Sequence, residues 1–283
     1  MTVALFGNTY KDQTLAQVEH LLAFFASHHV RVLLSQELRY EMHLTQDYDG
    51  YSEESSENVD YAISVGGDGT FLTTAAAVIG KDIPILGINC GHLGFLTAVT
   101  SDEIDSALEK LLEDDCTIDE RAVLQVSTQN GGHVMMPYAL NEVAVMKQEL
   151  SSMIVIDTYL NGHLLHTYKA DGLVIATPTG STAYSLSAGG PLVAPHVPAI
   201  VLTPIATHSL NVRPLVITED RVIELQVHSR SGSFLISVDG RSQAIKEDVK
   251  IEIRKAQHTI KIVQMKEHSF IYALKNKLLW GAE

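Results

Sequence analysis

A glycine-rich turn between an apolar run and a helical pattern constrains this chain more than any other feature. Residues 61–65 are apolar and β-prone, and residues 71–79 have the pattern of a helix. The turn between them contains three glycines within four residues, Gly66, Gly67 and Gly69. Glycine lets the backbone bend sharply and approach a ligand closely. Free N–H groups at the start of the following helix attract anions, so the turn predicts a phosphate-binding loop.

One acid, Asp68, stands in the middle of this turn. A carboxylate repels phosphate, so we expect Asp68 to face a hydroxyl or a metal while the glycines face phosphates. Such an arrangement favours phosphoryl transfer. A carboxylate is a weak base for an alcohol, so if the facing group is a hydroxyl, Asp68 would orient it and take its proton late in the reaction.

The first 119 residues alternate between strand and helix patterns. We expect strands at 3–6, 31–34, 61–65 and 83–88, and helices at 15–25, 71–79 and 101–112. The acidic stretch 45–58 is predicted to be a loop. This order favours an α/β domain over residues 1–119, with a Rossmann-like parallel sheet and flanking helices. Ligands of such a sheet bind beyond the carboxyl ends of the strands, where the glycine turn is expected.

After residue 119 the pattern changes to repeated hairpins, which predicts a mostly antiparallel β domain over residues 120–266. The expected turns are Asn130-Gly131-Gly132, Asn161-Gly162, and Ser231-Gly232 between strands 221–228 and 234–238. Strands at 249–253 and 260–262 are expected on either side of a polar turn. The apolar segment 267–283 is expected to return and pack on the first domain.

Three further segments have the composition of a ligand site. Residues 177–191 hold six Ser or Thr hydroxyls, one Tyr and three Gly, a density that suits the oxygens of ribose and phosphate, although a polar surface loop is the alternative. The pair Asn141-Glu142 interrupts a strand pattern and suits an adenine edge or ribose hydroxyls, with a strand bulge as the alternative. Phe95, in a turn after the strand at 83–88, could stack on a base, with a tight strand-to-helix turn as the alternative.

Together and in this order, these segments resemble the NAD kinase family over nearly the whole chain. The matching runs are Gly66 to Thr70, Asn141-Glu142, Asp171-Gly172, Pro178 to Tyr184, Pro204 to Leu210 and Arg213 to Val216. The glycine turn alone also resembles phosphofructokinases and the lipid kinases. Two positions depart from the family pattern. Arg241 stands at a position where family members often have Gln, which leaves open whether Arg241 or Gln243 reaches the site. Shortly after the glycine turn, several members have a basic residue, whereas this chain has Thr73 and Thr74.

The resemblance implies transfer of the γ-phosphoryl group of ATP to the 2′-hydroxyl of the adenosine ribose of NAD, giving NADP and ADP. It implies that Asp68 accepts the hydroxyl proton and that Gly69 lies against the ligand. Asn141 and Glu142 would hold the nicotinamide-side ribose or the adenine region, and Asp171 would hold the nicotinamide end. The remaining binding residues implied are Lys169, Thr182, Ala183, Tyr184, Ser185, Leu186, Ser187 and Ala206.

ATP and NAD are thus the expected substrates, with a divalent metal, Mg²⁺, as the expected cofactor. No Walker loop occurs, so the triphosphate would rely on glycine-loop amides and the metal, whose ligands the sequence does not reveal. The resemblance also implies a homodimer or homotetramer. The alternatives are a lipid or sugar kinase with the same turn, and a non-catalytic NAD sensor.

The composition of the chain indicates which kinds of binding partner and which cellular location to expect. The net charge is −14 with no basic stripe, so we expect no nucleic acid as partner. No apolar run reaches the ~18 residues that span a bilayer, so we expect no membrane association. Two cysteines are too few for a disulfide framework, and residues 2–6 are too short for a signal peptide. These features predict a cytoplasmic protein.

Overall fold

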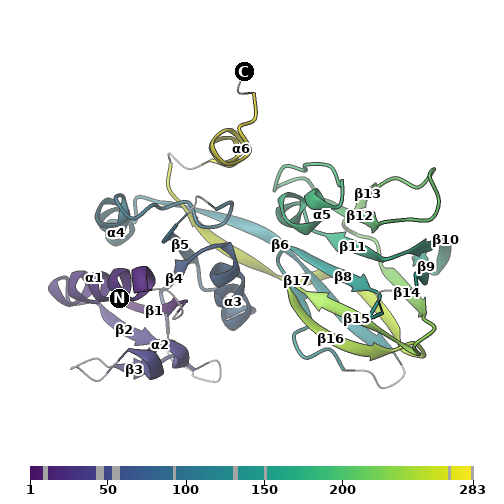
Figure 1. The fold of residues 1–283 in the computed structure, drawn as a ribbon. Helices are drawn as coiled ribbons and strands as arrows, with labels where there is room; N and C mark the ends of the chain where they lie inside the picture. The colour runs from purple at the N-terminus through teal and green to yellow at the C-terminus, as the bar shows by residue number, and fades with distance from the viewer. Residues whose placement is uncertain are drawn as a thin grey trace. The chain divides into compact units, whose positions relative to one another are not determined.

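The computed structural model describes residues 1–8, 12–42, 48–52, 58–91, 94–129, 133–149, 152–266 and 269–281. The chain divides into two compact units. Unit 1 comprises Met1–Glu120 and Ile260–Glu283, and unit 2 comprises Arg121–Thr259. Two long strands, β6 (Thr117–Gln129) and β17 (Lys250–Gln264), each contribute residues to both units (Figure 1).

Unit 1 contains a parallel sheet with helices around it. Its strands follow the order β3-β2-β1-β4-β5, and the end of β17 pairs in parallel with β5. The strand bounds are β1 Thr2–Gly7, β2 Arg31–Leu34, β3 Asp49–Gly50, β4 Tyr61–Gly66 and β5 Ile85–Asn89. The helices are α1 Asp12–Ser27, α2 Gln36–Glu41, α3 Asp68–Val78, α4 Ile104–Leu112 and α6 Phe270–Leu278.

Hydrophobic periodicity explains how the unit 1 core forms. On α1, Val18, Leu21 and Phe25 recur at helical spacing and are fully buried. They share one hydrophobic cluster with alternate residues of β1, Val3 and Leu5. The strand and helix order therefore confirms the predicted α/β fold class for this half of the chain.

Two local predictions in unit 1 differ from the structure. The helix expected from residue 71 begins at Asp68, because Gly67 is the N-cap and the glycine turn passes directly into the helix. The loop expected at 45–58 contains the short strand β3, which pairs in parallel with β2. Residues 43–47 and 53–57 lie outside the described residues.

Unit 2 consists mainly of antiparallel strands, which confirms the second half of the predicted fold class. One sheet has the order β13-β12-β11-β8-β15-β16, and a second group of strands has the order β10-β9-β14-β17. The bounds are β7 Tyr138–Ala139, β8 Glu142–Met146, β9 Ile154–Leu160, β10 His163–Ala170, β11 Gly172–Ala176, β12 Ala199–Ile205, β13 Leu215–Thr218, β14 Ile223–His228, β15 Ser233–Val238 and β16 Arg241–Lys246. Two short helices, η1 (Thr179–Thr182) and α5 (Tyr184–Ser187), follow β11.

Side chains from both groups of strands meet in one core. Val143 and Ile175 come from the first sheet, and Ile156 and Ile251 come from the second group; all four belong to one buried cluster. The opposite face of β8 and β11 is also buried, since Ala144 and Val174 pack with Val193 in a separate cluster. Burial on both faces explains why these strands are apolar without alternation.

The hairpin predictions in unit 2 have mixed outcomes. Strands β9 and β10 form the expected hairpin, with Asn161 and Gly162 both at positive φ in its turn. The expected pairing of 221–228 with 234–238 is wrong, because β14 pairs with β9 and β17 while β15 pairs with β8 and β16. The turn at Ser231-Gly232 therefore connects strands of different sheets.

Two more predictions concern β6 and β17. Strand β6 pairs antiparallel with β7, Leu124 with Ala139 and Gln125 with Tyr138. The second arm expected directly after the turn is wrong, because residues 133–137 form no strand, and residues 130–132 lie outside the described residues. The polar turn expected between 253 and 260 is wrong, since β17 continues through it. Within that stretch only Ala256 is buried, so the strand has a polar sequence there.

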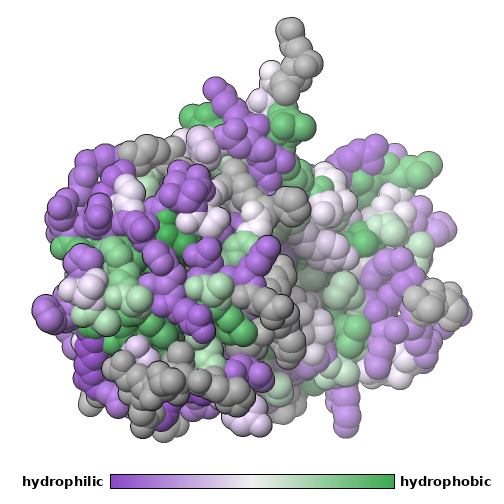
Figure 2. Space-filling model, turned by 60° about the vertical axis from the view of Figure 1, so that its left-hand side comes forward, coloured by the Kyte–Doolittle hydropathy of each residue, from purple (hydrophilic) through white to green (hydrophobic). Residues whose placement is uncertain are grey.

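The visible face in the space-filling view mixes hydrophilic residues with scattered hydrophobic ones (Figure 2). No helix in the described part of the chain combines the length and hydrophobicity needed to span a bilayer.

Candidate active site

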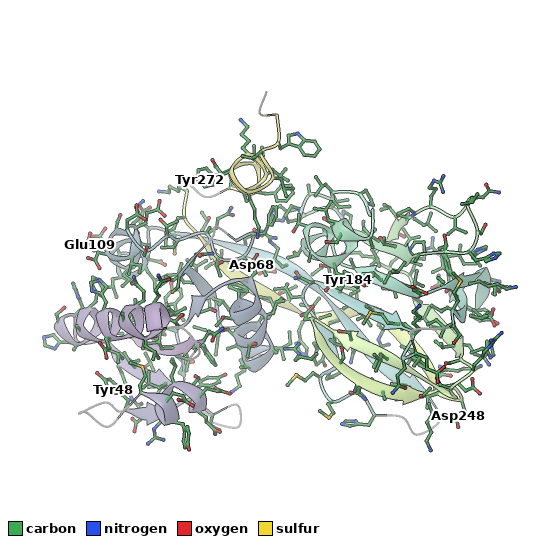
Figure 3. The ribbon with its side chains drawn as sticks, in the orientation of Figure 1. Tyr48, Asp68, Glu109, Tyr184, Asp248 and Tyr272 are labelled. Atoms are coloured by element: carbon green, nitrogen blue, oxygen red, sulfur yellow. The ribbon has the colours of Figure 1, made fainter. Side chains whose placement is uncertain are left out.

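The glycine turn lies where two parallel strands end. Strands β4 and β5 pair in parallel up to Gly66 and Asn89, so the residues that follow each strand lie at the same edge of the sheet. Asp68 is the first residue of α3 and lies at the N-terminal end of this helix (Figure 3). The segment after β5 supplies Phe95, Leu96 and Thr97.

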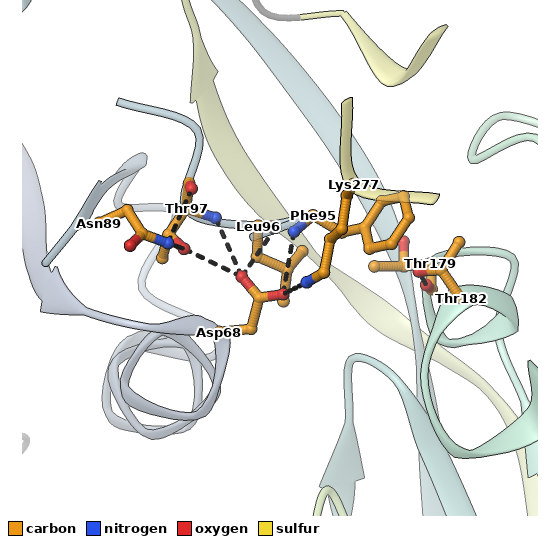
Figure 4. A network of polar contacts seen from close by, with 8 residues as sticks. All are labelled: Asp68, Asn89, Phe95, Leu96, Thr97, Thr179, Thr182 and Lys277. Atoms are coloured by element: carbon orange, nitrogen blue, oxygen red, sulfur yellow. Dashed lines mark hydrogen bonds and ion pairs between the residues drawn. The ribbon is translucent and has the colours of Figure 1, made fainter. Parts of the chain in front are cut away.

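The Asp68 carboxylate binds the backbone of that second segment (Figure 4). Its Oδ2 accepts from Phe95 N at 2.9 Å. Its Oδ1 accepts from Leu96 N at 3.1 Å, from Thr97 N at 3.2 Å and from Thr97 Oγ1 at 3.0 Å. Four hydrogen bonds from one short turn fix the orientation of the carboxylate.

A lysine from the far end of the sequence completes these contacts. Lys277 Nζ of α6 lies 3.2 Å from Asp68 Oδ2 and donates to it. The same ammonium group lies 4.9 Å from the centre of the Phe95 ring. The side chains of Lys277 and Asp68 are 34% and 28% exposed, so the pair remains open to solvent. Phe95 thus contacts Asp68 through its backbone and Lys277 through its ring.

Asn89 and Gly94 explain how the 95–97 turn is held. Asn89 Nδ2 donates to Thr97 Oγ1 at 2.9 Å, and Asn89 Oδ1 accepts from Gly91 N at 2.6 Å. A Cβ on Gly94 would collide with the Asp68 carboxylate and with Thr97 Oγ1. Only glycine therefore allows the turn to approach Asp68 this closely.

The three glycines of the first turn have different surroundings. A Cβ on Gly66 would collide with the Thr70 side chain, so Gly66 is required by packing. A Cβ on Gly67 or Gly69 would meet nothing within 4 Å. The backbone at the start of α3 is therefore accessible, as a phosphate-binding helix N-terminus requires.

In unit 2, Asp239 holds the predicted pair Asn141 and Glu142. Its carboxylate accepts from Leu140 N at 2.8 Å, from Asn141 N at 2.9 Å and from Glu142 N at 3.0 Å. Asp239 itself has a positive φ of 48° in the turn between β15 and β16. Arg241 follows it, with Nη2 4.0 Å from an Asp239 oxygen.

Glu142 is a buried acid with an unusual protonation equilibrium. It is 9% exposed, and its Oε2 has no hydrogen-bond partner among the described residues. Burial, reinforced by the neighbouring Asp239 carboxylate, raises the pKa of Glu142 to about 7. A hydrogen bond from the Tyr184 backbone opposes this shift. Burial likewise raises the pKa of Asp239.

The segment rich in hydroxyls, 177–187, packs tightly on Asn141. Thr177 N donates to Asn141 O at 2.9 Å, and Thr177 Oγ1 donates to Leu140 O at 2.6 Å. A Cβ on Gly180 would collide with the Asn141 backbone. Many of the hydroxyls are thus used internally: Ser185 Oγ lies 2.8 Å from Thr203 Oγ1, and Thr182 Oγ1 donates to Thr179 O.

The remaining predicted residues lie at the other end of β11. In the strand register Ala176 pairs with Glu142, while Gly172 pairs with Met146 and Ile205. Asp171, before Gly172, forms an ion pair of 2.7 Å with Lys147, and Lys169 O accepts from His208 N at 2.9 Å. Ala206 follows β12 at this end with a positive φ of 45°.

Tyr184 lies between these two groups. Its backbone contacts the Glu142 carboxylate, and its hydroxyl donates to Met146 Sδ at 3.9 Å. The side chain is 39% exposed. The predicted residues of unit 2 therefore form two groups along β8 and β11, and Tyr184 contacts both strand ends.

Comparison with known protein families now identifies the chain. Residues 3–116 match the family model of the ATP-NAD kinase N-terminal domain, and residues 140–265 match that of the ATP-NAD kinase C-terminal domain. The chain belongs to the ATP-NAD kinase family. Among curated relatives, a NAD kinase of Bacteroides fragilis is 45% identical over 287 residues, covering 100% of this chain and 99% of the relative. A NAD kinase of Porphyromonas gingivalis is 43% identical, covering 99% of this chain and 98% of the relative.

Solved structures of ATP-NAD kinase relatives share the fold. A yeast NADH kinase complexed with NADH has a TM-score of 0.87 and 26% identity, covering 100% of this chain and 89% of that one. A NAD kinase from Archaeoglobus fulgidus in complex with ATP has a TM-score of 0.76 and 27% identity, covering 99% of this chain and 98% of that one.

Sequence reasoning missed several residues at the site of this ATP-NAD kinase family member. Lys277 carries no local motif, so no signal pointed to it. Asp239 could have been found, because Asp239-Gly240 is a strong hairpin signal. Gln243, left open as a ligand contact, holds the segment before β7: it accepts from Met135 N at 2.9 Å and donates to His133 O at 2.6 Å.

Proposed function

We propose that this chain transfers the γ-phosphoryl group of ATP to the 2′-hydroxyl of the adenosine ribose of NAD, with Asp68 as the group that accepts the hydroxyl proton. The position of Asp68 supports its role as proton acceptor. Its carboxylate is fixed at the start of α3, beside the accessible backbone of Gly67 and Gly69. Membership in the ATP-NAD kinase family supports the reaction itself.

The chemistry is a single displacement at phosphorus. The ribose 2′-oxygen forms a bond to the γ-phosphorus while the bond from this phosphorus to the β,γ-bridging oxygen breaks. The electron pair leaves with ADP, and the hydroxyl proton passes to Asp68. The protein contributes mainly by alignment and by stabilising negative charge. N–H groups at the start of α3 would bind phosphate oxygens.

The binding roles in unit 2 follow from chemical type. Asn141 and Glu142 would hold ribose or adenine, and Glu142 can donate a hydrogen bond when it is protonated. Thr182, Ala183, Tyr184 and Ser187 would line the adenosine pocket, with Ser185, Leu186 and Ala206 close to the nucleotide. Asp171 and Lys169 would hold the nicotinamide end. Relatives solved with NADH and with ATP support these two kinds of nucleotide as substrates.

Magnesium fits the site as a companion of the donor. Mg²⁺ takes oxygen ligands, usually one or two carboxylates together with substrate phosphates and waters. The described residues contain no group of three or more His, Cys, Asp or Glu arranged for a metal. Hydrogen bonds from the 95–97 turn and from Lys277 already occupy the Asp68 carboxylate. We therefore propose that phosphate oxygens and waters supply the ligands of the ion. When bound, the ion supplies positive charge to the phosphates.

We also propose a homodimer or homotetramer located in the cytoplasm. The oligomer rests on the family resemblance of the sequence. The location rests on cysteine usage: the sequence has two cysteines, Cys90 and Cys116, and neither is joined in a disulfide, as is usual in a reducing compartment.

One incubation separates the candidate functions. Purified protein is mixed with ATP, Mg²⁺ and NAD, and NADP is measured by a dehydrogenase that requires it. NADP formation with an equal amount of ADP supports the proposal. Binding of NAD without product indicates a sensor, and phosphorylation of a diacylglycerol or a sugar but not of NAD indicates a different kinase. Either of the last two results rejects the proposed function.

A further inference from the structure

Asp68 accepts more hydrogen bonds than its lone pairs readily accommodate. A carboxylate offers about four lone-pair sites. Asp68 receives four donors from the 95–97 turn and a fifth from Lys277. Two of these donors, Phe95 N and Lys277 Nζ, occupy both lone-pair sites of Oδ2, so a substrate hydroxyl can bind this oxygen only after one of the two leaves.

Lys277 is the donor best able to leave. The other four are three backbone N–H groups and the Thr97 hydroxyl of the 95–97 turn. Asn89 holds this turn by donating to Thr97 Oγ1. Lys277 reaches Asp68 from a separate helix at the end of a flexible four-carbon stem, and its side chain is 34% exposed. It also donates to Oδ2, whose one other donor within the described part of the chain is the Phe95 N–H.

Lys277 also supplies a charge that the neighbouring segments lack. Between residues 61 and 100 the sequence contains one Lys or Arg, Lys81. Its ammonium group donates to Ser52 O at 3.2 Å and lies 5.0 Å from the centre of the Tyr51 ring, beyond the C-terminal end of α3. A phosphoryl group at the start of α3 would therefore meet the negative Asp68 without a nearby lysine from its own segment.

The face of α6 that carries Lys277 is the face that contacts the site. Phe270, Ala273 and Lys277 follow helical spacing at i, i+3 and i+7. Ala273 is buried, and the Phe270 ring centre lies 6.5 Å from that of Phe95. Lys275 carries the same charge, but residues two apart do not share a helix face.

We propose that Lys277 is a further catalytic residue: it covers Asp68 Oδ2 before substrates bind, and its ammonium group then contacts the transferring phosphoryl group of ATP. This role rests on the proposed function of Asp68. A swing of the side chain is enough, because the acceptor hydroxyl and the phosphoryl group must both lie beside Asp68. The lysine leaves the position that the hydroxyl needs and places its positive charge against the charge that the phosphates carry.

The test compares K277Q, K277R and the matched control K275Q in the full chain. Each variant is measured for kcat, for the KM of ATP, for NAD dissociation by calorimetry, and for melting temperature. K277Q is expected to lower kcat about 10- to 100-fold while NAD dissociation changes less than about threefold, in line with loss of one charged contact made in the transition state. K277R keeps the charge and is expected to retain at least about a third of wild-type kcat, and K275Q to stay within about twofold.

Two results would overturn the role of Lys277. One is a K277Q variant that turns over as fast as wild type or faster, which would mean that Lys277 only blocks Asp68. The other is an equal loss in K275Q and K277Q, which would mean that only the general charge of α6 matters. Both are distinct from failure of the proposed function, in which the wild-type chain itself would form no NADP.

Discussion

At the scale of single residues, the buried acid Glu142 should make the folding stability depend on pH, which can be tested without substrate. Its pKa is raised from 4.5 to about 7 by burial and by Asp239. Between these two pH values the folded state keeps a proton that the unfolded state has lost. Stability attributable to this group is therefore lost as the pH rises through that window, and the penalty is constant above it.

Replacing Glu142 by Gln removes this titration. We expect the free energy of unfolding, measured by urea titration, to increase for E142Q relative to wild type as the pH rises from 4.5 to 7. The gain should reach at most about 3.5 kcal/mol, because one pKa unit corresponds to ~1.4 kcal/mol. The control is E109Q, which removes a carboxylate from the exposed surface of α4 instead of from the core. A pH-independent difference for E142Q would contradict the burial of an ionisable carboxyl.

At the scale of secondary-structure elements, the turn between β5 and α4 packs closely against the start of α3. A Cβ at Gly94 would collide with Asp68, whereas at Gly91 the nearest atom is Asn89 Oδ1 at 3.9 Å. We expect Gly94→Ala to destabilise the fold by about 1–3 kcal/mol through overpacking and to lower activity, because the turn must withdraw from Asp68. Gly91→Ala should stay near wild type in both respects. Thermal unfolding and the NADP assay check the pair, and equal behaviour of the two variants would contradict the close approach.

Local sequence predicted elements well where one face of each element is buried and poorly where pairing is decided at a distance. The helical spacing on α1 and the Asn161-Gly162 turn each carry their own signal. Pairing of β14 with β17 and of β15 with β8 depends on residues far away in sequence. A serine-glycine turn between two strands looks the same whether the strands pair with each other or enter different sheets.

Strand β17 shows a second reason why a prediction of secondary structure was wrong. Its residues 254–259 are mostly exposed and polar, so the pattern resembles a turn although the backbone stays extended. The segment 177–191 shows the opposite case: its hydroxyls suggested a ligand or a surface loop, and the structure uses several of them for internal bonds such as that from Ser181 Oγ to Pro178 O.

For the molecule as a whole, the candidate site could be predicted in its motifs but not in its supporting contacts. Asp68, Asn141 and Glu142 stand in recognisable runs. Lys277 lies 209 residues from Asp68 in the sequence, and nothing near it marks its partner. The opposite-end placement of Asp171 and Glu142 along β11 likewise follows from strand register, which no single motif reveals.

The net charge of the whole molecule should make its melting temperature depend on salt concentration. The chain carries 34 acidic and 20 basic residues, a net charge of −14. Excess charge of one sign destabilises a compact state through self-repulsion, which salt screens. We expect the melting temperature to rise by roughly 2–5 °C between 50 and 500 mM NaCl, as measured by calorimetry. A melting temperature that falls with salt would show that attractive pairs such as Lys261–Asp82 outweigh this repulsion.

The proton-accepting role of Asp68 is tested most directly by the turnover of Asp68→Asn compared with its binding of NAD. Asn keeps the shape of the side chain but cannot take the hydroxyl proton. We expect kcat to fall on the order of 10²- to 10⁴-fold, with NAD dissociation nearly unchanged. The control is Asp82→Asn, which removes another ion-paired carboxylate of unit 1 and should leave kcat unchanged. An Asp68→Asn variant that keeps near-full kcat would contradict the mechanism.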